Sequence, residues 1–540
     1  MKILGLSLTA AVLLASTSLL RADDLLPADK NINEAVDHYI AAALKRDGIS
    51  PAPQADDANL IRRLTLDLVG RIPAVAETKA FVESTDADKR VKLVDRLMAS
   101  PAFVRHQATE LDVMLMYGNG GTLREYLLKA LAENRSWDRI YRDIMLTDEA
   151  DPGQKGAGDF VKTRLKDLDK LTNDVSVLFF GVNISCAKCH DHPRVADWKQ
   201  DHFYGMKSFF ARTFDNGGFV AEREFATAVK FRTTAGQDKQ AKMMFLTGKM
   251  IDTPEATIEG SNEEQKLEKD RLETAKKNKT APPRPKFSAR QQLVELSLQP
   301  EQRVFFAKSI VNRVWHRLLG HGLVMPLDQM HSQNPPSHPE LLDWLARDVA
   351  EHDYDLRRLT RGLVLSQAYA RSSRWTKGDP PKPQTFAVAR VRPLTPMQLA
   401  TSLRLATNDP ASFADTLKPE ELEKKIEQIE SAARGFAGSI EQPRDDFQIS
   451  VGEALLFSNG DRILKEYLAD TGGLMGRLKQ LTEPKEIVET AVRTVLSRPP
   501  SEQEVQVLTE YLSRRSDRAV EARRQMVWAL LAGAEFRFNY

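Results

Sequence analysis

The chain has 540 residues, 42% hydrophobic and 28% charged, which excludes wholesale disorder and, at roughly 150 residues per domain, predicts about three or four domain-sized units. Its two cysteines are too few for a disulfide-rich scaffold. Lysine and arginine total 77 against 75 for aspartate and glutamate, so the net charge of +2 gives no support to a nucleic-acid-binding protein with an overall positive field.

Residues 1–22 have the order of a secretory signal peptide. Met1-Lys2 gives a positive start, residues 3–20 are mostly apolar, and Ala22 precedes a polar mature sequence, so we expect cleavage after Ala22. The alternative is an uncleaved anchor, which Ser16-Thr17-Ser18 makes a poor permanent span. No later segment has 18 consecutive apolar residues. We therefore expect an exported protein of the periplasm or cell envelope, with no permanent membrane span after signal cleavage.

Residues 23–218 are predicted to form the first helical domain. Apolar residues recur at helical spacing between Ile32 and Leu44, and the same spacing returns in 60–69, 91–98 and 126–131. Breaks that contain proline, glycine or aspartate separate these segments. Towards the end of the domain an apolar helical run leads into a cluster of cysteine and histidine, and an aromatic helix from about Gln200 leads out of it.

A small antiparallel β insert is predicted over residues 219–251, because polar and apolar residues alternate in 229–233 and in 242–246. Residues 252–286 are predicted to be a linker. Residues 263–279 are rich in glutamate and lysine, and Pro282, Pro283 and Pro285 follow them, a pattern typical of a solvated helix or a flexible tether.

Residues 287–540 are predicted to form a second helical domain with explicit helix starts. Ser337–Glu340 and Ser501–Glu504 have the capping-box pattern, and Thr395–Gln398 adds a proline at the first helical position. The sequence therefore predicts a mainly α fold: two helical domains with a small antiparallel β insert and a charged linker.

Both cysteines of the chain lie in the motif Cys186-Ala187-Lys188-Cys189-His190, which has C-x-x-C-H spacing. Two thiols three residues apart can add to the two vinyl groups of one haem, and the adjacent histidine then reaches the iron as its proximal ligand. Export agrees with this interpretation, because c-type haem is attached outside the bacterial cytoplasm. The predicted cofactor is thus haem c, bound by Cys186 and Cys189 and ligated by His190.

Two residues are candidates for the sixth iron ligand. Met206 and His202 lie one helical turn apart on the following helix and compete for this role, and a methionine ligand would raise the reduction potential. Met206 could equally pack with the neighbouring phenylalanines in the core. A five-coordinate iron would favour ligand or peroxide chemistry over simple electron transfer. Arg194 and Trp198 are candidate partners for the haem propionates.

Zinc or another transition metal is the main alternative to haem. Cys186, Cys189, His190 and His192 offer four nitrogen and sulfur ligands, with His202 in reserve. Consecutive Cys189 and His190 side chains point in different directions, which strains a single tetrahedral site made from all four. A disulfide would leave the histidines unexplained, and thioredoxin-like dithiol chemistry expects a βαβ unit that the flanking sequence does not predict.

The second half has a polar cluster of its own, but its spacing matches no H-E-x-x-H metalloprotease helix. The sequence also has no G-x-S-x-G, no P-loop and no dinucleotide-binding fingerprint. Helix capping and loop hydrogen bonding are the expected roles of its members, although a separate catalytic site remains an alternative. The cluster consists of His316, His321, Asp328, His331 and His338.

Several long segments resemble two families of unknown function. The segments LFFGVNISCAKCHDHPRVADWKQDHFYGMKSFFA, DANLIRRLTLDLVGRIPAVAETKAFV and KLVDRLMASPAF resemble the planctomycete cytochrome-associated family, domain of unknown function 1549. A second set of segments resembles the usual partner of that family, domain of unknown function 1553. These segments are AKSIVNRVWHRLLGHGLV, NPPSHPELLDWLA and LTRGLVLSQAYARSS. The tail segments LLFSNGDRIL, VLSRPPSEQE and WALLAGAEFRFNY resemble the end of that partner. These segments together span most of the chain.

The resemblance implies haem or redox work at the cell envelope, and it places Cys186, Cys189 and His190 on the family's C-x-x-C-H position. The chain departs from the family pattern at two sites. Where relatives carry Arg-Trp and then Trp-Leu-Asp, it has Arg105-His106 and Glu110-Leu111-Asp112. It also lacks the separate cytochrome module that often precedes the pair, and if that module carries the haem, the motif here would serve another metal.

We therefore expect an exported c-type haem-binding protein that transfers electrons in the envelope, together with a redox partner protein there. The first alternative is an exported metal-dependent enzyme, such as a hydrolase linked to polymer degradation, that uses the Cys/His cluster. The second is a non-catalytic envelope interaction protein. Neither enzymatic activity, the substrate nor the oligomeric state follows from the sequence.

Overall fold

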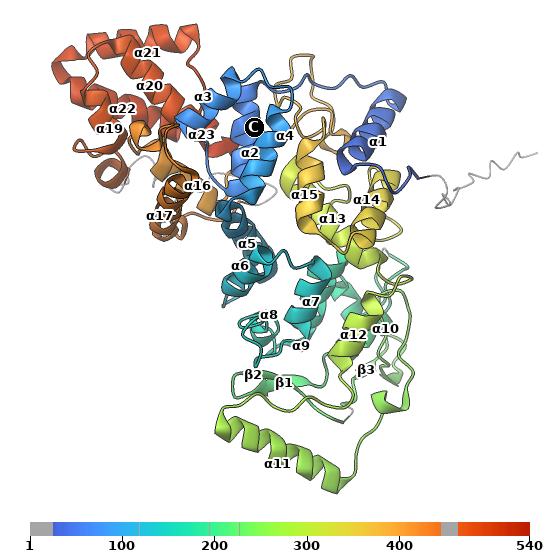
Figure 1. The fold of residues 1–540 in the computed structure, drawn as a ribbon. Helices are drawn as coiled ribbons and strands as arrows, with labels where there is room; N and C mark the ends of the chain where they lie inside the picture. Colours follow the sequence, from blue (N-terminus) through green and yellow to red (C-terminus); the bar gives the residue numbers. More distant parts are fainter. Residues whose placement is uncertain (1–24, 118, 194, 226, 444–462) are drawn as a thin grey trace, which may run out of the picture.

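The computed structural model describes residues 25–540 except for 118, 194, 226 and 444–462. The predicted signal peptide, the candidate propionate partner Arg194 and most of the segment LLFSNGDRIL lie outside the described residues. Helices dominate the described chain, and its strands form short two-stranded antiparallel sheets (Figure 1). The mainly α fold class with a small β insert is confirmed. Within the described ranges, we find no helix with the length and apolar character needed to cross a membrane.

The first helical region runs from α1 to α10, and local capping sets its boundaries. The Asp56 side chain accepts a hydrogen bond from the Asn59 amide before α2, and α2 ends at Gly70, whose φ of 72° suits glycine. α9 follows the same pattern, with Asp167 as its N-cap and Gly181 at φ 69° as its end. The helices are α1 (Ile32–Arg46), α2 (Asp57–Val69), α3 (Val75–Glu83), α4 (Lys89–Ala99), α5 (Pro101–Met116), α6 (Arg124–Ala132), α7 (Trp137–Met145), α8 (Asp159–Lys162), α9 (Leu168–Phe180) and α10 (Gln200–Ser208).

Two small sheets follow α10 in the predicted insert. The strand expected at 229–233 is confirmed as β3, whereas the segment 242–246 is not a regular strand and forms a single antiparallel bridge, between Met244 and Met250. Backbone hydrogen bonds from Ile251 to Met243 and from Phe245 to Lys249 join it to the residues just beyond it, and this tight turn is too short to form a regular sheet. The antiparallel pairs are β1 (Thr213–Asn216) with β2 (Phe219–Glu222), and β3 (Lys230–Arg232) with β4 (Asp238–Gln240).

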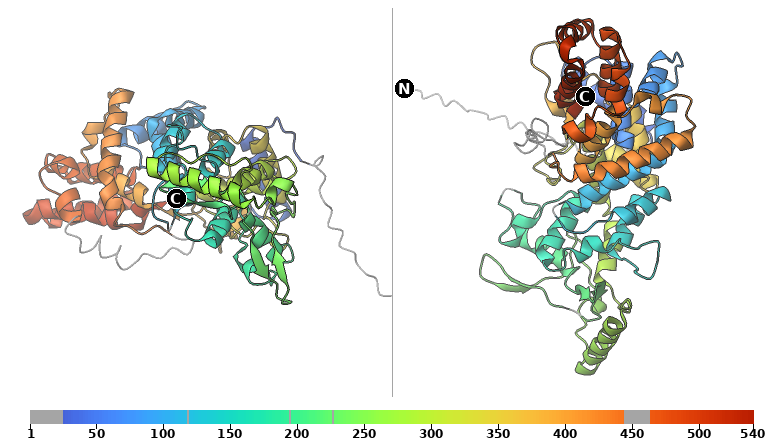
Figure 2. Two further views of the ribbon diagram at one scale, coloured as in Figure 1. Left: turned by 90° about the horizontal axis from the view of Figure 1, so that it is seen from below. Right: turned by 90° about the vertical axis from the view of Figure 1, so that its left-hand side faces the viewer.

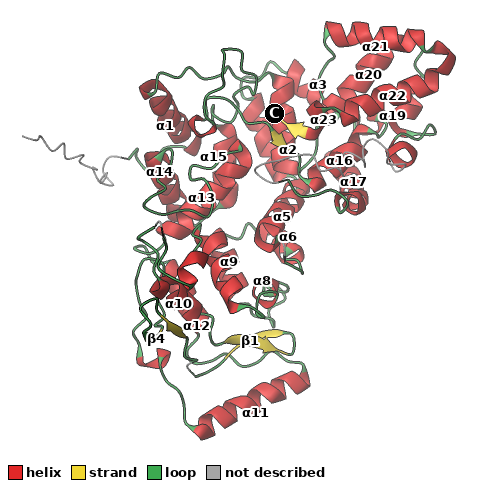
Figure 3. Ribbon diagram, turned by 180° about the vertical axis from the view of Figure 1, so that it is seen from behind, coloured by secondary structure: helices red, strands yellow, loops and turns green. Residues whose placement is uncertain are grey.

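The predicted linker contains a regular helix, α11 (Asn262–Asn278). Ser261 and Glu264 form a capping box at its start, and only Leu272 and Ala275 are buried. The Leu272 carbonyl accepts a hydrogen bond from the Asn216 side chain of β1 at 3.1 Å. The charged segment is therefore a solvated helix tied to the small sheet. Figure 3 shows it beside the strands, far from the short pair at the C-terminus.

Helices begin at all three predicted starts in the second region, and two of the three predicted caps are confirmed. Thr395 and Ser501 each form a complete capping box with the residue three positions later. At the third, α14 begins at Pro339 as expected, but the capping box is wrong: the N-cap is His338, and the Ser337 hydroxyl contacts the His338 ring. The helices are α12 (Ala289–Ser297), α13 (Val304–Leu319), α14 (Pro339–Glu351), α15 (Leu356–Leu365), α16 (Pro396–Ala406), α17 (Pro419–Ala437), α19 (Gly473–Lys479), α20 (Pro484–Leu496), α21 (Glu502–Arg514), α22 (Ala519–Ala532) and α23 (Ala534–Arg537).

The two halves of the sequence interleave in space. α1 packs against α14 and α15, α9 packs against α13, and α5 contacts α17, so one hydrophobic core runs through both regions. The C-terminal helices α19–α22 lie at one end of the molecule and α11 at the other (Figures 1 and 2). The last residues return to the centre, where β5 (Arg392–Pro393) pairs with β6 (Phe538–Asn539).

A buried carboxylate on α2 joins three distant parts of the chain. Asp67 accepts hydrogen bonds from the Tyr369 hydroxyl at 2.8 Å, from the Arg392 guanidinium at 2.7 Å and from the Asn539 amide at 2.9 Å. Its side chain and that of Tyr369 are almost wholly buried. Such a charge is tolerated in the interior because several donors replace its lost water.

Candidate functional site

The C-x-x-C-H motif lies on an exposed turn between α9 and α10. After Gly181 the chain makes one bridge to the second region and then forms a single 3₁₀ turn, Ser185–Lys188. Side chains three positions apart eclipse on such a turn, which favours placing Cys186 and Cys189 on the same side. Both are exposed free thiols, whereas Ala187 between them is buried and anchors the turn. The two sulfurs are therefore accessible to a reagent from solvent.

His190 has the hydrogen-bonding pattern of a metal-ligating imidazole. Its Nδ1 lies 2.7 Å from the Asp191 carbonyl oxygen, which only accepts, so Nδ1 carries the hydrogen and donates it. Nε2 then keeps its lone pair on an exposed ring. A backbone carbonyl that binds the other ring nitrogen in this way fixes the tautomer and orientation of metal-bound histidines.

The other two histidines near the motif have the opposite tautomer. His192 Nδ1 accepts a hydrogen bond from the Val195 amide at 3.1 Å, and His202 Nδ1 accepts one from the Lys199 amide at 3.2 Å. In the neutral ring the hydrogen then sits on Nε2, which makes that nitrogen a donor. Burial lowers the pKa of His202, which keeps this ring neutral.

Met206 lies on α10 one turn beyond His202, as predicted, but its side chain is fully buried. It packs in the same hydrophobic core as Phe203, Phe209 and Phe210. Trp198 is also buried and meets the His202 ring edge to face, with ring centroids 5.8 Å apart. The predicted packing role of Met206 is therefore the one seen in this conformation.

Side chains of α10 hold the motif backbone. The Gln200 amide donates to the Cys189 carbonyl at 3.2 Å, and the Tyr204 hydroxyl donates to the Lys188 carbonyl at 3.0 Å. The Gln200 backbone amide also donates to the Asp191 carboxylate at 3.0 Å. Sequence reasoning missed these supports, because a glutamine and a tyrosine on a helix carry no signal that distinguishes them from ordinary surface residues.

A loop of the second region contacts the motif segment. The Asn183 amide donates to the Asp328 carbonyl at 2.7 Å, and the Asn183 side chain donates to the Asp328 carboxylate at 2.9 Å. Further on, Ser332 donates from its backbone amide and its hydroxyl to Asp197, at 2.8 and 2.7 Å. His331 lies between these contacts, and its lowered pKa reflects burial first and then the nearby His192 ring. Two of the predicted second-half residues therefore meet the motif region.

The other members of the second-half cluster lie elsewhere. His338 and His321 both face the Phe386 ring, with centroids 5.5 and 6.3 Å away, and His316 lines a separate cavity. Across the described residues, no group of three histidine, cysteine, aspartate or glutamate side chains has the arrangement of a metal site. The four-ligand alternative at the motif would therefore need a rearrangement before a metal could bind.

The burial of His338 predicts an acid-sensitive fold. Burial lowers its pKa to about 4 from an ordinary value of 6.5, so the unfolded chain binds this proton more readily than the folded one. The stability that the neutral His338 ring contributes is therefore fully present above about pH 6.5 and is lost as the pH falls towards 4. We expect urea midpoints to fall over this range, and a His338→Gln variant to show a shallower fall. The exposed His38→Gln variant is the control and should match the wild type; an equal fall in all three proteins would contradict the assignment.

Comparison with known proteins agrees with the predicted domain pair. The family described as PSCyt2, protein of unknown function (DUF1549), matches residues 35–215, which include the motif. The family described as PSD1, protein of unknown function (DUF1553), matches residues 289–436. No curated protein and no solved structure matches the chain. The chain therefore belongs to the proteins that combine a DUF1549 domain with a DUF1553 domain.

Proposed function

We propose that this is an exported c-type haem protein that transfers electrons to or from a partner protein in the bacterial cell envelope. The observation that carries the proposal is the His190 ring, whose Nδ1 donates to the Asp191 carbonyl and leaves Nε2 as a ligand beside two exposed thiols. The signal-like residues 1–22 support export, since covalent haem attachment takes place outside the cytoplasm.

The residues of the turn fit the attachment of haem c. Each thiol of Cys186 and Cys189 would add across one vinyl group, giving its sulfur to one carbon and its hydrogen to the other. His190 would supply the nitrogen on the near side of the iron, and the Asp191 carbonyl would hold that ring in place. A bound haem supplies one-electron redox chemistry, which no protein side chain at the turn offers by itself.

The surroundings of the motif favour a sixth iron ligand that does not come from this chain and can exchange. Met206 would have to leave the core to reach a metal at the surface, and this would cost the burial of a methionine side chain, about 1.5–3 kcal/mol. His202 presents an N–H donor and not a lone pair. We therefore propose a site at which water, or a group brought by the partner protein, completes the coordination.

The test is expression of the chain in a bacterium that carries haem-attachment machinery, followed by a visible spectrum of the denatured protein and metal analysis. We expect an α-band that survives denaturation and one haem per chain in the exported protein. The Cys186→Ala/Cys189→Ala double variant should lose all of it, because no thioether bond can form. Lys188→Ala, between the two cysteines, is the matched control and should keep it.

Other outcomes would favour the alternatives. Stoichiometric zinc or copper without haem would overturn the proposal and support a metal-dependent enzyme that rearranges the motif on binding. A chain with neither haem nor metal would leave a structural or redox-active cysteine pair and an interaction protein. Unprocessed protein that stays in the cytoplasm would contradict export.

A further inference from the structure

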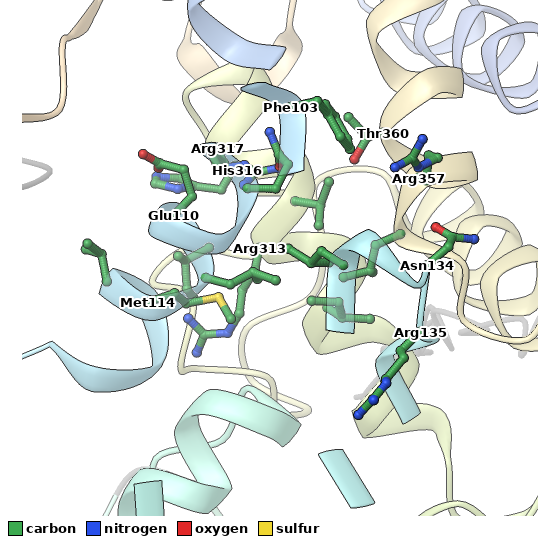
Figure 4. A pocket seen from close by; sticks show the side chains of 18 residues that line it. Phe103, Glu110, Met114, Asn134, Arg135, Arg313, His316, Arg317, Arg357 and Thr360 are labelled. Carbon is green, nitrogen blue, oxygen red and sulfur yellow. The ribbon is translucent and has the colours of Figure 1, made fainter. Parts of the chain in front are cut away.

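A cavity of about 200 Å³ lies between the two family domains, away from the exposed turn. α5 and the α6–α7 connection form one wall, and α13 and α15 form the other (Figure 4). Half of its 18 lining residues are apolar, and these include Leu111, Met114, Ile310, Val314 and Leu356. A cavity with apolar walls and a few polar groups at one point has the general character of a small-molecule site.

Four arginines line the cavity, and two of them, Arg313 and Arg317, come from α13. Arg313 donates to the Val177 carbonyl at 2.5 Å, and Arg317 donates to the Gln107 side chain at 2.6 Å. The Nε atom of each is buried and has no hydrogen-bond partner. Asp328 attracts Arg313 and Glu110 attracts Arg317, but neither arginine has a carboxylate oxygen within ion-pair distance among the described residues. Each therefore retains donors that the protein does not use.

The acidic groups nearby do not neutralise these charges. Glu110 lies close to Arg317 at the same side of the cavity (Figure 4), but burial raises the pKa of its carboxyl, which favours the neutral form. The Asp67 carboxylate is already hydrogen-bonded to Arg392, Tyr369 and Asn539. The cavity consequently has an excess of positive charge in an environment where charge is poorly screened by water.

We propose that this cavity binds a small organic carboxylate with an aliphatic or aromatic body. A carboxylate accepts the parallel N–H donors of a guanidinium, and the hydrocarbon part fits the apolar walls. Inorganic anions would leave those walls unused, and a sugar acid would place hydroxyl groups against them without partners. This site is independent of the haem proposal, because none of its residues belongs to the motif.

The test is calorimetric titration of the full-length mature protein with benzoate and hexanoate, alongside benzamide and hexanamide as uncharged analogues of the same shape. We expect the carboxylates to bind and the amides to bind at least about tenfold more weakly, because charge-assisted hydrogen bonds are lost. Equal binding of the acid and its amide would overturn the proposal. So would inorganic phosphate that binds as tightly as benzoate.

Substitutions at the cavity should have different effects according to the charge of the residue they replace. Arg317→Gln should weaken benzoate binding about ten- to a hundredfold. Glu110→Gln should leave it nearly unchanged, because burial already favours the neutral form of this carboxyl. The exposed Arg518→Gln is the control and should change nothing. Val314→Phe fills the cavity without altering its charge and should also abolish binding, so unchanged affinity in both Arg317→Gln and Val314→Phe would contradict the site.

Discussion

Replacement of Asp67 by alanine is expected to destabilise the fold by about 3–5 kcal/mol, which is the usual cost of removing one partner from a buried charge pair. The Arg392 guanidinium, 2.7 Å from the carboxylate, would remain in the interior without its counter-charge. Tyr369 and Asn539 would each lose a buried acceptor. The measurement is urea unfolding of the purified chain at neutral pH.

The control for this prediction is an ion pair of the same kind on the surface. Asp95 accepts two hydrogen bonds from Arg361, but both side chains are about half exposed to solvent. Asp95→Ala should therefore cost only about 0.2–1 kcal/mol. If the two variants lose similar stability, the Asp67 cluster does not hold the α2 helix to the C-terminal strand as the structure indicates.

Much of the fold could be predicted from local pattern. Helix starts at Thr395 and Ser501 were recoverable because a capping box is written in four consecutive residues. At Ser337–Glu340 the same pattern located the helix but not its cap, because the N-cap is one residue later, at His338, and the Ser337 hydroxyl contacts the His338 ring. The strand expected at 242–246 is reduced to a single bridge, because alternation shows which side chains are buried but not how many residues pair, and here the chain turns back at once.

Long-range arrangement was not predictable in this way. Nothing in the sequence near Asp67 shows that a tyrosine and an arginine about three hundred residues away, and an asparagine at the end of the chain, will converge on it. The interleaving of α1 with α14 and α15 is equally invisible to periodicity, because an amphipathic helix shows that a face is buried but not against which partner.

The candidate site could likewise be predicted where it depends on local sequence, but not where it depends on tertiary contacts. The C-x-x-C-H motif was evident from spacing, whereas its supports on α10 and the loop around Asp328 depend on tertiary contacts. The arginine cavity was missed entirely. Its members lie on α5 and α13, which separately resemble ordinary amphipathic helices, and only their packing places Arg313 and Arg317 in an apolar space. The sequence did contain one signal. Arg313 and Arg317 lie one helical turn apart in the mostly apolar segment that forms α13, and an arginine buried in such a helix needs a polar partner.

The roles of the three candidate iron ligands can be separated by substitutions matched to their surroundings. His190→Ala removes the ring that carries a free Nε2, so we expect it to lose the wild-type haem complement or to shift the haem spectrum to a weaker ligand field. His202→Gln keeps a residue suited to the third position of α10 and should leave the spectrum unchanged. Met206→Leu nearly conserves volume in the core and should also leave it unchanged.

These variants distinguish a surface haem from one that draws its far ligand from the core. A Met206→Leu variant with a shifted α-band and a lower reduction potential would mean that α10 opens when haem is attached and that Met206 binds the iron. This result would overturn the proposal that the sixth iron ligand is exchangeable. An unchanged Met206→Leu spectrum, together with binding of added imidazole or cyanide to the wild type, would support it. The prediction rests on the full burial of Met206 and on the hydrogen bond from the Lys199 amide to His202 Nδ1.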